Sequence, residues 1–492
     1  MLFNSFAFAV FLPIVFFMYW FIANRNLRAQ NLLLLIASFV FYGWWDWRFL
    51  FLLMILSFAN YFTSIAIDNN ALNNNKKKIW LVTGLIINIG ILGFFKYYNF
   101  FVDSFIDLIS LTGYKLPKST LKIILPLGIS FYVFISVSYL IDIYKETFKA
   151  SKNLVAVLLS LSFFPIILAG PIQRPSLLLP QINKKREFSY DRAIDGLSQI
   201  LWGLFTKIAI ADKVAYHVDN IFLKYSDLTS STLVLGAILY SIQIYADFSG
   251  YSNIAIGTAR IFGFDLIRNF NYPYFSKDIT EFWKRWHISL TSWFRDYIFL
   301  PLSFLISSKI KSDKVLFIKS DLFIYIIASG ITWLLTGLWH GANYKFIIWG
   351  AIQGVFLILY HIQKNPRKRL FNKIGIAKNN SLVSIIETLL TLIIIMISWI
   401  FFRAENVTKV FDYLSDIFSK SIFSLPQVFP KNVLLLLIVF MVIEWMQRQK
   451  NHALQIENLK YRIVRWGVYY GIIILIIISL GDSKQSFIYS QF

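Results

Sequence analysis

The chain has 492 residues, of which 57% are hydrophobic and only 15% are charged. Soluble globular domains carry about 25% charged residues, so this composition excludes an ordinary cytosolic enzyme. Lysine and arginine outnumber aspartate and glutamate by 48 to 26, which gives a formal net charge of +22. In a chain this apolar such an excess belongs to cytoplasmic loops, and we expect no nucleic-acid partner. Cysteine is absent, which excludes a disulfide framework, a thiolate nucleophile and a cysteine-based metal site, and we expect no bound metal.

Charge-free runs recur along the chain, and nine of them are strong candidates for membrane spans. They cover residues 1–24, 29–45, 49–67, 79–95, 123–141, 154–173, 228–246, 322–344 and 346–363. Further candidates are the shorter runs 388–402, 433–443 and 466–481 and the charge-interrupted stretch 193–213. The first run lacks a basic leader and a small-residue cleavage site, so we interpret it as a retained span. The sequence predicts an all-α polytopic membrane protein with about 11 or 12 transmembrane helices.

The loops between these runs are short and often basic. The longest polar stretches, residues 174–192 and 260–321, are too short to bury a core of their own, so we predict a single domain over residues 1–492. Lysine and arginine cluster in four of the loops, which the positive-inside rule assigns to the cytoplasm. These clusters lie at residues 25–28, 76–78, 184–186 and 364–369.

The run 154–173 has a basic segment on each side, at residues 145–152 and 174–186. A helix that crosses the membrane once cannot leave both flanks in the cytoplasm. Pro165, Gly170 and Pro171 interrupt the run, and broken backbone is tolerated at membrane depth where protein or a wet cavity surrounds it. A re-entrant hairpin reconciles the two flanks. A straight helix with a weak charge bias is the alternative.

His340 stands out among the five histidines, because the run 322–344 contains no other titratable side chain except tyrosines. An ionisable residue inside a membrane span marks a functional site by default. Imidazole takes and returns a proton near neutral pH, as acyl transfer to a hydroxyl group requires. Gly337 and Gly341 flank it and allow another backbone or a substrate chain to approach. The alternative is a structural histidine hydrogen-bonded between helices.

His287 lies in a second pattern, the stretch 280–297, where large apolar side chains recur every three or four residues. This spacing predicts one amphipathic helix at the membrane interface or packed on the bundle. Asp278 and Glu281 supply its capped start. Lys284 and Arg295 contribute to a basic face. Aromatic anchoring with an incidental histidine is the alternative interpretation.

Asp247 follows the apolar run 228–246 directly and opens the segment Asp-Phe-Ser-Gly-Tyr-Ser. A carboxylate, three hydroxyl groups and a flexible backbone are thereby close to a membrane boundary. Asp247 is a candidate for orienting a histidine or a substrate hydroxyl group. A helix cap at the end of a span is the alternative.

These segments resemble the membrane-bound O-acyltransferase family and, within it, the branch of the alginate O-acetyltransferase membrane component. The resemblance covers most of the chain and rests on segments that contain both histidines. They are Leu-Pro-Leu-Gly-Ile-Ser-Phe-Tyr at 125–132, Gly-Pro-Ile-Gln-Arg at 170–174, Asp-Phe-Ser-Gly-Tyr-Ser at 247–252, Asn-Tyr-Pro-Tyr at 271–274, Glu-Phe-Trp-Lys-Arg-Trp-His-Ile-Ser-Leu at 281–290, Trp-Phe-Arg-Asp-Tyr at 293–297, Gly-Leu-Trp-His-Gly at 337–341 and Phe-Ile-Tyr-Ser-Gln-Phe at 487–492.

The resemblance implies transmembrane helices with re-entrant and amphipathic segments around a central tunnel. It implies that His340 is the catalytic base and His287 the second active-site histidine. It further implies substrate contacts from residues of the same motifs, namely Trp286, Arg295, Asp296, Tyr297, Trp339, Asp247 and Ser249. The chain departs from the branch at Asn253, where Asp is expected, and at Ile135, where Gln is common. These departures leave the acyl chemistry intact and bear on the identity of the acceptor.

The resemblance also implies the reaction partners. The donor is cytoplasmic acetyl-coenzyme A, used as a substrate and not as a bound cofactor. The acetyl group emerges on the far side of a bacterial plasma (inner) membrane, where a periplasmic or membrane-anchored acetylase transfers it to an exported polysaccharide such as alginate or another cell-surface glycan. Membrane lipid surrounds the multi-pass protein. The rival hypotheses are transfer of D-alanine or another acyl group to a cell-wall polymer, and a channel or transporter for a small molecule.

Overall fold

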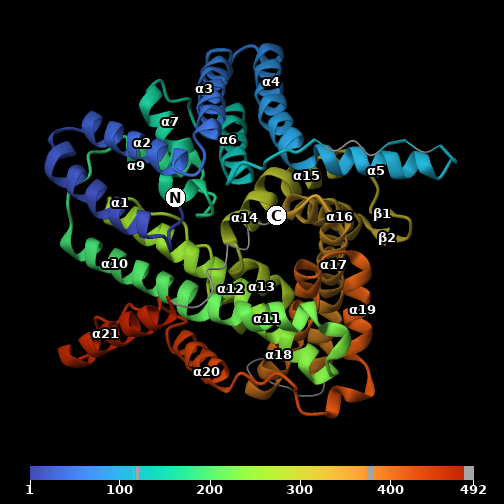
Figure 1. Cartoon of the computed structure of the whole chain (residues 1–492). Coiled ribbons are helices and arrows are strands. Elements are labelled where there is room, and N and C mark those ends of the chain that lie inside the picture. The colour runs from blue at the N-terminus through green and yellow to red at the C-terminus, as the bar shows by residue number, and fades with distance from the viewer. Residues whose placement is uncertain (115, 118–120, 374–379, 481–492) are drawn as a thin grey trace. The chain divides into compact units, whose positions relative to one another are not determined.

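The computed structural model describes residues 1–114, 116–117, 121–373 and 380–480 (Figure 1). This part of the chain is almost entirely helical, and its strands are the antiparallel pair β1 (Lys314–Val315) and β2 (Ile318–Lys319). The chain forms two compact units: residues 1–200 with 251–267, and residues 201–250 with 268–492. Helices α10 (Tyr190–Leu204) and α12 (Ser230–Ile261) each contribute to both units. The single domain over residues 1–492 stays a prediction.

Within the described residues, nine helical segments are long and apolar enough to cross a membrane. Three shorter apolar helices accompany them, at Leu27–Gly43, Ile129–Tyr144 and Leu154–Ile167. The protein is thus an all-α polytopic membrane protein, as the composition predicts. The expected eleven or twelve spans are reached only when these shorter helices are counted.

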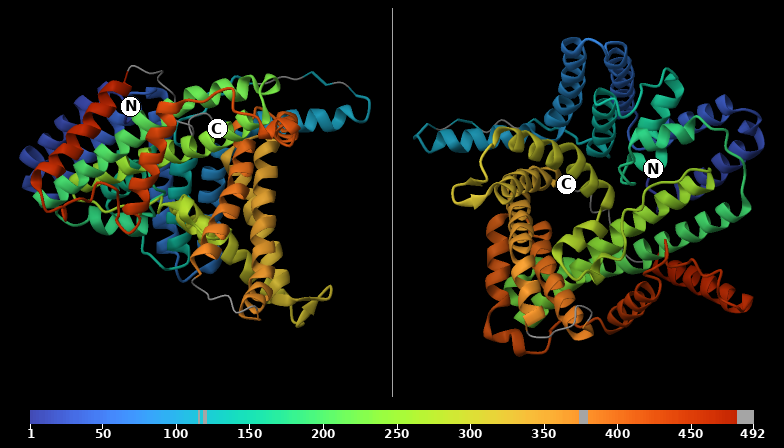
Figure 2. Two further views of the ribbon diagram at one scale, coloured as in Figure 1. Left: turned by 90° about the horizontal axis from the view of Figure 1, so that it is seen from below. Right: turned by 180° about the vertical axis from the view of Figure 1, so that it is seen from behind.

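The first unit contains the N-terminal helices, and α3, α4 and α6 lie side by side in it (Figure 2). Buried amides join α3 to α4, because Asn60 and Asn88 donate to each other's side-chain oxygens at 3.1 and 2.9 Å. Such pairing satisfies polar groups that lipid cannot. Its elements are α1 (Phe6–Phe17), η1 (Met18–Ile22), η2 (Ala23–Arg25), α2 (Leu27–Gly43), α3 (Trp47–Asn69), α4 (Asn74–Leu92), η3 (Gly93–Tyr97), α5 (Tyr98–Ser110), α6 (Ile129–Tyr144), α7 (Leu154–Ser162), α8 (Phe164–Ile167) and α9 (Pro175–Ile182), with most of α10 and the last turns of α12.

The interrupted run 154–173 forms two short helices, α7 and α8, that break at Phe163, two residues before Pro165. At 1.5 Å per residue the span 154–167 is about 20 Å long, which is too short to cross a hydrocarbon core of about 30 Å. The two flanks of the run also meet, since the Ser176 hydroxyl donates to the Asp142 carboxylate at 3.0 Å. Both flanks therefore lie at one end of α6, and the geometry supports the re-entrant hairpin over the straight helix.

The basic cluster at 76–78 lies at this same end of α6. Lys77 is buried, with its ammonium paired with Glu146 just beyond the helix and 5.2 Å from the centre of the Tyr144 ring. Residues 76–78, 145–152 and 174–176 thus meet at one end of α6, and the cytoplasmic assignment of this end stays a prediction.

Arg186, the last residue of the basic cluster 184–186, is buried and is not part of the charged surface. Its guanidinium is buried and donates to the Tyr19 hydroxyl at 2.8 Å, to the Asn31 side-chain oxygen at 2.7 Å and to the Ile182 carbonyl at 2.8 Å. Lys184 and Lys185 are exposed. The cluster at 184–186 thus presents two exposed charges, while the third side chain ties the loop to the N-terminal helices.

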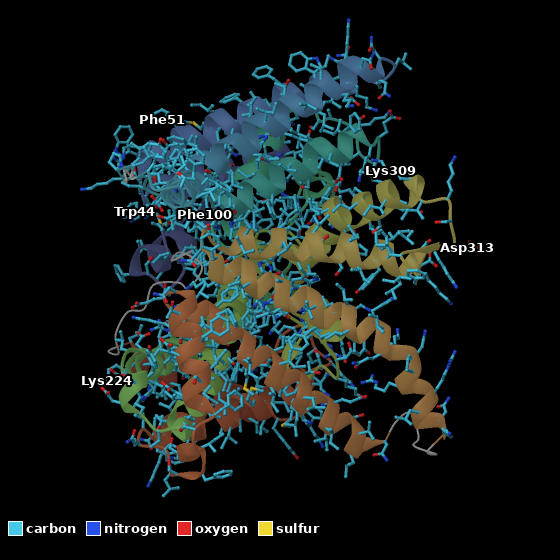
Figure 3. The ribbon with its side chains drawn as sticks, turned by 90° about the vertical axis from the view of Figure 1, so that its right-hand side faces the viewer. Trp44, Phe51, Phe100, Lys224, Lys309 and Asp313 are labelled. Atoms are coloured by element: carbon cyan, nitrogen blue, oxygen red, sulfur yellow. The ribbon has the colours of Figure 1, made fainter. Side chains whose placement is uncertain are left out.

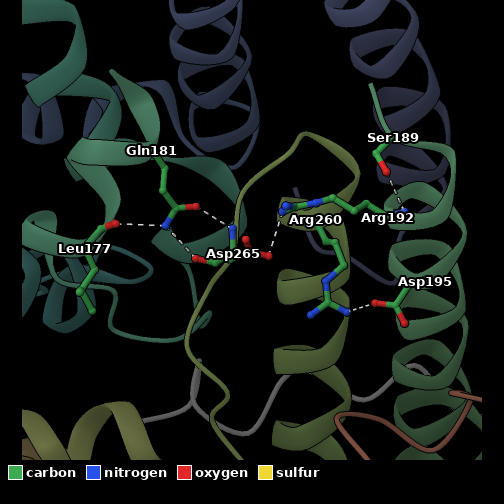
Figure 4. Close-up of polar contacts among 7 residues, drawn as sticks. All are labelled: Leu177, Gln181, Ser189, Arg192, Asp195, Arg260 and Asp265. Atoms are coloured by element: carbon green, nitrogen blue, oxygen red, sulfur yellow. Dashed lines mark hydrogen bonds and ion pairs between the residues drawn. The ribbon is translucent and has the colours of Figure 1, made fainter. Parts of the chain in front are cut away.

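The segment that follows α12 is fastened to the same unit by side chains from α9 and α10 (Figure 4). Gln181 pairs with the backbone of Asp265 in both directions, at 2.8 and 3.0 Å, and Arg192 donates to the Asp265 carboxylate at 2.9 Å. One turn away, Arg260 of α12 forms an ion pair with Asp195 of α10. These contacts fix the end of α12 within the first unit.

The second unit contains the remaining helices, among which α16 and α17 lie side by side (Figure 1). Its elements are η4 (Phe205–Asp212), α11 (Lys213–Leu223), η5 (Tyr225–Asp227), most of α12, η6 (Pro273–Phe275), α13 (Ile279–Arg285), α14 (Ile288–Phe294), η7 (Arg295–Phe299), α15 (Leu300–Lys309), α16 (Ser320–His340), α17 (Tyr344–Lys373), α18 (Ser381–Arg403), α19 (Val407–Ile417), η8 (Lys420–Phe423), α20 (Lys431–Met446) and α21 (Arg462–Ser479), with the hairpin β1–β2.

Glycines let α16 and α17 approach closely. A Cβ atom added at Gly337 would lie 2.2 Å from the Phe346 carbonyl oxygen, and one added at Gly350 would lie 2.2 Å from the Trp333 carbonyl oxygen. Small residues at helix contacts are the usual device for close packing in membranes. The contact positions the end of α16, where His340 lies, against the start of α17.

The exposed surface of the described residues carries apolar side chains suited to lipid and polar side chains suited to water (Figure 3). Trp44 and Phe51 are 64% and 53% exposed, as expected for side chains that face lipid or its interface. Lys309 and Asp313 lie at the polar connection between α15 and β1.

The re-entrant hairpin predicts the outcome of cysteine labelling, which is simple in a chain without cysteine. Lys149→Cys and Lys184→Cys, both at exposed positions, should react with a membrane-impermeant maleimide from the same side. Trp44→Cys is the control: it precedes α3, whose 23 residues lead to the end near residues 74–78, so it should react from the opposite side. Opposite sidedness of positions 149 and 184 would contradict the hairpin.

The close approach of α16 and α17 predicts different effects of alanine at two glycines of one helix. Gly337→Ala should lower the thermal unfolding temperature of the purified protein, because overpacking costs about 1–3 kcal/mol. Gly330→Ala should leave that temperature unchanged or raise it, since its added Cβ meets nothing within 4 Å. Equal melting temperatures for the two variants would contradict the role of Gly337.

Candidate active site

The segment 280–297 is not the single amphipathic helix that its spacing predicts. Asp278 caps α13 as expected, accepting a hydrogen bond from the Glu281 amide at 2.8 Å, but α13 ends at Arg285 and α14 begins at Ile288. The break has a backbone cause. The Arg285 carbonyl accepts from the Asn271 amide at 2.9 Å, and the Ile288 amide donates to the Asn269 carbonyl at 2.9 Å. A continuous helix would have used both groups internally.

His287 lies at this break, with φ 43° and ψ 53° in the left-handed region. A residue other than glycine in this region is uncommon and often marks a functional position. The residue is 1% exposed, so the side chain lies inside the packed protein, whereas Lys284 and Arg295 of the same segment are exposed. Its Nδ1 lies 3.1 Å from the side-chain oxygen of Asn269, which also accepts from the Ser289 hydroxyl at 2.9 Å. Burial lowers the pKa of the His287 imidazole to about 3, so this side chain is neutral near pH 7.

His340 is the last residue of α16 and is 5% exposed. Aromatic rings surround it: the ring centroids of Trp339, Trp349 and Phe402 lie 4.9, 5.0 and 5.0 Å from that of the imidazole. The backbone beside Phe402 is held in turn by Lys345, whose ammonium donates to the carbonyl of Phe402 at 3.1 Å and to that of Ala404 at 2.6 Å. A lysine at the carbonyl end of α18 is electrostatically favourable.

Trp339 brings the two histidines into one site. Its ring centroid lies 6.1 Å from that of His287 and 4.9 Å from that of His340. The ring of Phe248, which follows Asp247 on α12, lies 4.6 Å from the His287 ring at an angle of 85°. Three sequence motifs therefore meet at the rings of Trp339 and His287. They are Gly-Leu-Trp-His-Gly at 337–341, the segment 281–290 and Asp-Phe-Ser-Gly-Tyr-Ser at 247–252.

Asp247 is not a helix cap, because α12 continues through it to Ile261. Its carboxylate lies 2.5 Å from the ammonium of Lys207, which also pairs with Asp212 at 2.8 Å. Lys207 and Asp247 are almost fully buried, and Lys207 and Asp212 belong to the π-helical segment η4. Buried charges need such partners, so this cluster fastens η4 to α12 one residue from Phe248. Ser249 lies buried beyond Phe248.

The other predicted contact residues fall into two groups. Trp286 is 1% exposed and packs in an aromatic core, with its ring centroid 5.1 Å from that of Phe270 and 4.9 Å from that of Trp399. Tyr297 is also buried, 5.2 Å from the Trp293 ring. Arg295 and Asp296 pair with each other at 2.8 Å, and the Arg295 side chain is 64% exposed.

Arg295 lines a mostly apolar cavity of about 370 Å³ between the α13–α14–η7 segment and α16. The cavity reaches Ile288, the neighbour of His287, and Thr336, which lies one helical turn before His340. Neither histidine lines the cavity itself, but each lies within one helical turn of a residue that does.

A second cavity of about 330 Å³ adjoins the first, and both are lined by Thr280, Lys284 and Tyr325. This second cavity is polar and reaches His361 and Lys364 on α17, at the start of the basic cluster 364–369. His361, which the sequence suggests is a surface group, is exposed and stacks on Tyr325 with ring centroids 4.2 Å apart. The lining of this second cavity is of mixed charge, since Asp278 and Glu281 line it together with Lys284 and Lys364.

The sequence did not identify three residues of the site. Asn269 left no signal, because a single amide in a polar stretch is ordinary. Lys207 left a weak one, as a lysine inside the otherwise apolar stretch 193–213 that needs a buried partner. Lys345 lies five residues after His340, but in the sequence it looks like the polar start of the next span. The terminal segment 487–492 lies outside the described residues.

Comparison with known families defines the class of protein. The model of the membrane-bound O-acyltransferase family matches residues 145–404, which contain both histidines and both cavities. This chain belongs to the membrane-bound O-acyltransferase family and is an O-acyltransferase, so the resemblance in the sequence is confirmed.

Individual relatives refine the comparison. The chain is 37% identical to the probable alginate O-acetylase AlgI of Pseudomonas aeruginosa over 85% of its own length and 74% of that protein. It is 33% identical to the peptidoglycan O-acetyltransferase of Helicobacter pylori, over 83% of this chain and 78% of that one. The teichoic acid D-alanyltransferase of Bacillus subtilis is 31% identical, but the match covers 49% of this chain and 60% of that protein.

The site predicts unequal losses for the two histidines. His340→Ala and His340→Gln should lower acyl transfer by about 10²- to 10⁴-fold, because neither side chain accepts and returns a proton near neutral pH. His287→Gln keeps an amide that accepts a hydrogen bond and should retain measurable transfer. The assay is acetyl transfer by membranes that contain equal amounts of each folded variant. Complete loss in His287→Gln would mean that the two histidines act as one unit.

Proposed function

We propose that the protein transfers acetyl groups from cytoplasmic acetyl-coenzyme A, across a bacterial plasma membrane, for O-acetylation of an exported polysaccharide. One observation carries the proposal: two buried histidines, His287 and His340, flank Trp339, next to helices α14 and α16, which line a mostly apolar cavity. The relatives named as alginate and peptidoglycan O-acetylating proteins, which align over more than four fifths of this chain, support acetyl as the acyl group.

The chemistry follows from a general base beside a thioester. His340 takes the proton of the acceptor hydroxyl group as its oxygen attacks the thioester carbonyl carbon. The new C–O bond forms, the C–S bond breaks, and the proton passes to the leaving thiolate, which departs as coenzyme A thiol. With no cysteine in the chain, direct attack by the hydroxyl group is simpler than a thioester intermediate on the enzyme.

The cavities suit a donor with a polyanionic head and a narrow acylated arm. Lys284, His361 and Lys364 line the outer, polar cavity together with Asp278 and Glu281, and its two lysines are the cations available to phosphate groups. The inner cavity is mostly apolar, which suits the acylated arm of the donor. The expected cytoplasmic position of the cluster 364–369 places the donor on the correct side for acetyl-coenzyme A.

The acceptor side involves a partner. We propose that a periplasmic or membrane-anchored acetylase receives the acetyl group, or presents the glycan, at the end of the protein opposite the outer cavity. D-Alanyl transfer from an acyl carrier protein is the second candidate within the family. It is less supported, because the D-alanyltransferase match covers only 49% of this chain.

Charge reversal at the outer cavity tests whether acetyl-coenzyme A is the donor. Lys284→Glu should raise the KM for acetyl-coenzyme A about tenfold or more with a smaller change in kcat, since losing one phosphate contact costs about 1.5–3 kcal/mol. Lys309→Glu, at an exposed lysine outside both cavities, is the matched control and should behave as the wild type. The measurement is transfer of labelled acetyl in membranes. An equal KM in both variants, or transfer only from a loaded carrier protein, would contradict acetyl-coenzyme A as the donor.

A further inference from the structure

We infer that Asn269 is a positioning residue that fixes the hydrogen on Nδ1 of His287 and so directs the Nε2 lone pair at the attacking hydroxyl group. The inference about the hydroxyl group rests on the proposed function. The inference about the tautomer rests on geometry alone.

The orientation of the Asn269 amide is determined by its neighbours. The atom that faces His287 also lies 3.3 Å from the backbone nitrogen of Ser289 and 2.9 Å from its hydroxyl oxygen. A backbone N–H only donates, so the shared Asn269 atom must be the acceptor oxygen and not the amide nitrogen. The contact of 3.1 Å to His287 Nδ1 then requires that Nδ1 carries the hydrogen. In a neutral imidazole Nε2 is consequently the acceptor.

The backbone holds this arrangement in place. The Asn269 carbonyl accepts from the Ile288 amide, and the Asn271 amide donates to the Arg285 carbonyl, both at 2.9 Å. The segment 269–271 therefore clamps the chain on both sides of His287, which keeps a left-handed conformation that is unfavourable for a side chain with a Cβ. Asn269 is itself 0% exposed, so water does not compete for its oxygen.

Aromatic rings occupy the other faces of the imidazole. Phe248 of α12 lies 4.6 Å away, Phe270 6.4 Å and Trp339 of α16 6.1 Å, measured between ring centroids. The titratable and charged groups on these packed elements are Tyr245 and Asp247 on α12, Arg268 next to Asn269, Lys284 and Arg285 on α13, Arg295 and Asp296 beyond α14, and His340 on α16. Asp247 pairs with Lys207, which it shares with Asp212, and Tyr245 donates to Glu444 at 2.6 Å.

The proposed function gives the two histidines different tasks. With its hydrogen fixed on Nδ1, His287 accepts a hydrogen bond from the hydroxyl group through Nε2. His340 then takes the proton. An amide that fixes the tautomer of one histidine therefore aligns the hydroxyl group for the other.

The tautomer is measured directly on the full-length protein in detergent with [¹⁵N]histidine, since the chain has only five histidines. His287→Gln assigns the His287 resonances. The wild type should show the hydrogen on Nδ1 of His287 near neutral pH, Asn269→Ala should lose this fixed tautomer, and Asn269→Asp should raise the His287 pKa by about one unit or more. Asn269→Asp keeps an acceptor for Ser289 and remains informative if Asn269→Ala does not fold.

The control is Asn88→Ala, which removes a buried asparagine that pairs with Asn60 in the other unit. It should lower thermal stability without changing the His287 resonances. A hydrogen on Nε2 of His287 in the wild type, or resonances that are unaffected by both substitutions at Asn269, would overturn the inference.

Kinetics test the link to the reaction. Asn269→Ala should lower kcat for acetyl transfer by about 10- to 100-fold with KM for acetyl-coenzyme A within about twofold of the wild type, because an orienting contact is lost and not a binding contact. Asn269→Asp should move the acidic limb of the kcat/KM profile to higher pH. An unchanged kcat and profile would overturn the orienting role. No transfer by the wild type would refute the proposed function, while the resonances would still decide the tautomer.

Discussion

A polar side chain buried inside the protein has to find its partner there, and in the second unit this constraint shapes the site. The imidazole of His287 is bonded to the amide oxygen of Asn269, and the backbone around it is bonded to the same segment. These bonds replace those of a continuous helix and produce the break between α13 and α14. The break turns His287 toward Trp339, which also contacts His340. The left-handed backbone at His287 costs about 1–3 kcal/mol, which the surrounding contacts have to offset.

The sequence predicts the helices well because their signal is local. Charge-free runs mark spans such as α3, α16 and α18, and Pro165 marks the break between α7 and α8. The isolation of His340 in an apolar run also identifies it without any structure. The break at His287 could not be predicted, because the spacing of apolar residues is compatible with one helix and the competing bonds come from residues that precede it by more than ten positions. The partner of Asp247 could not be predicted either, because Lys207 lies forty residues away along the chain.

The two cavities beside the site differ in the polarity of their lining. Lysines and carboxylates line the outer cavity, mostly apolar side chains line the inner cavity, and both histidines lie within one helical turn of residues of the inner cavity. Under the proposed function, the lysines would attract an anionic donor and the apolar lining would accept its acylated arm. The polar side chains of this region pair within the protein: His287 with Asn269, Asp247 with Lys207, and Lys345 with the carbonyls of Phe402 and Ala404.

The most direct test of the account is acetyl transfer in sealed, inside-out membrane vesicles that contain the protein, its acetylase partner and the glycan. Labelled acetyl-coenzyme A is supplied only to the exposed cytoplasmic face, and ionophores abolish all ion gradients. The account predicts that label accumulates on glycan in the lumen, that coenzyme A thiol is released outside in equal amount, and that His340→Ala membranes do neither. Lumenal accumulation of intact donor, or label transfer that requires a gradient, would identify a transporter and contradict the account.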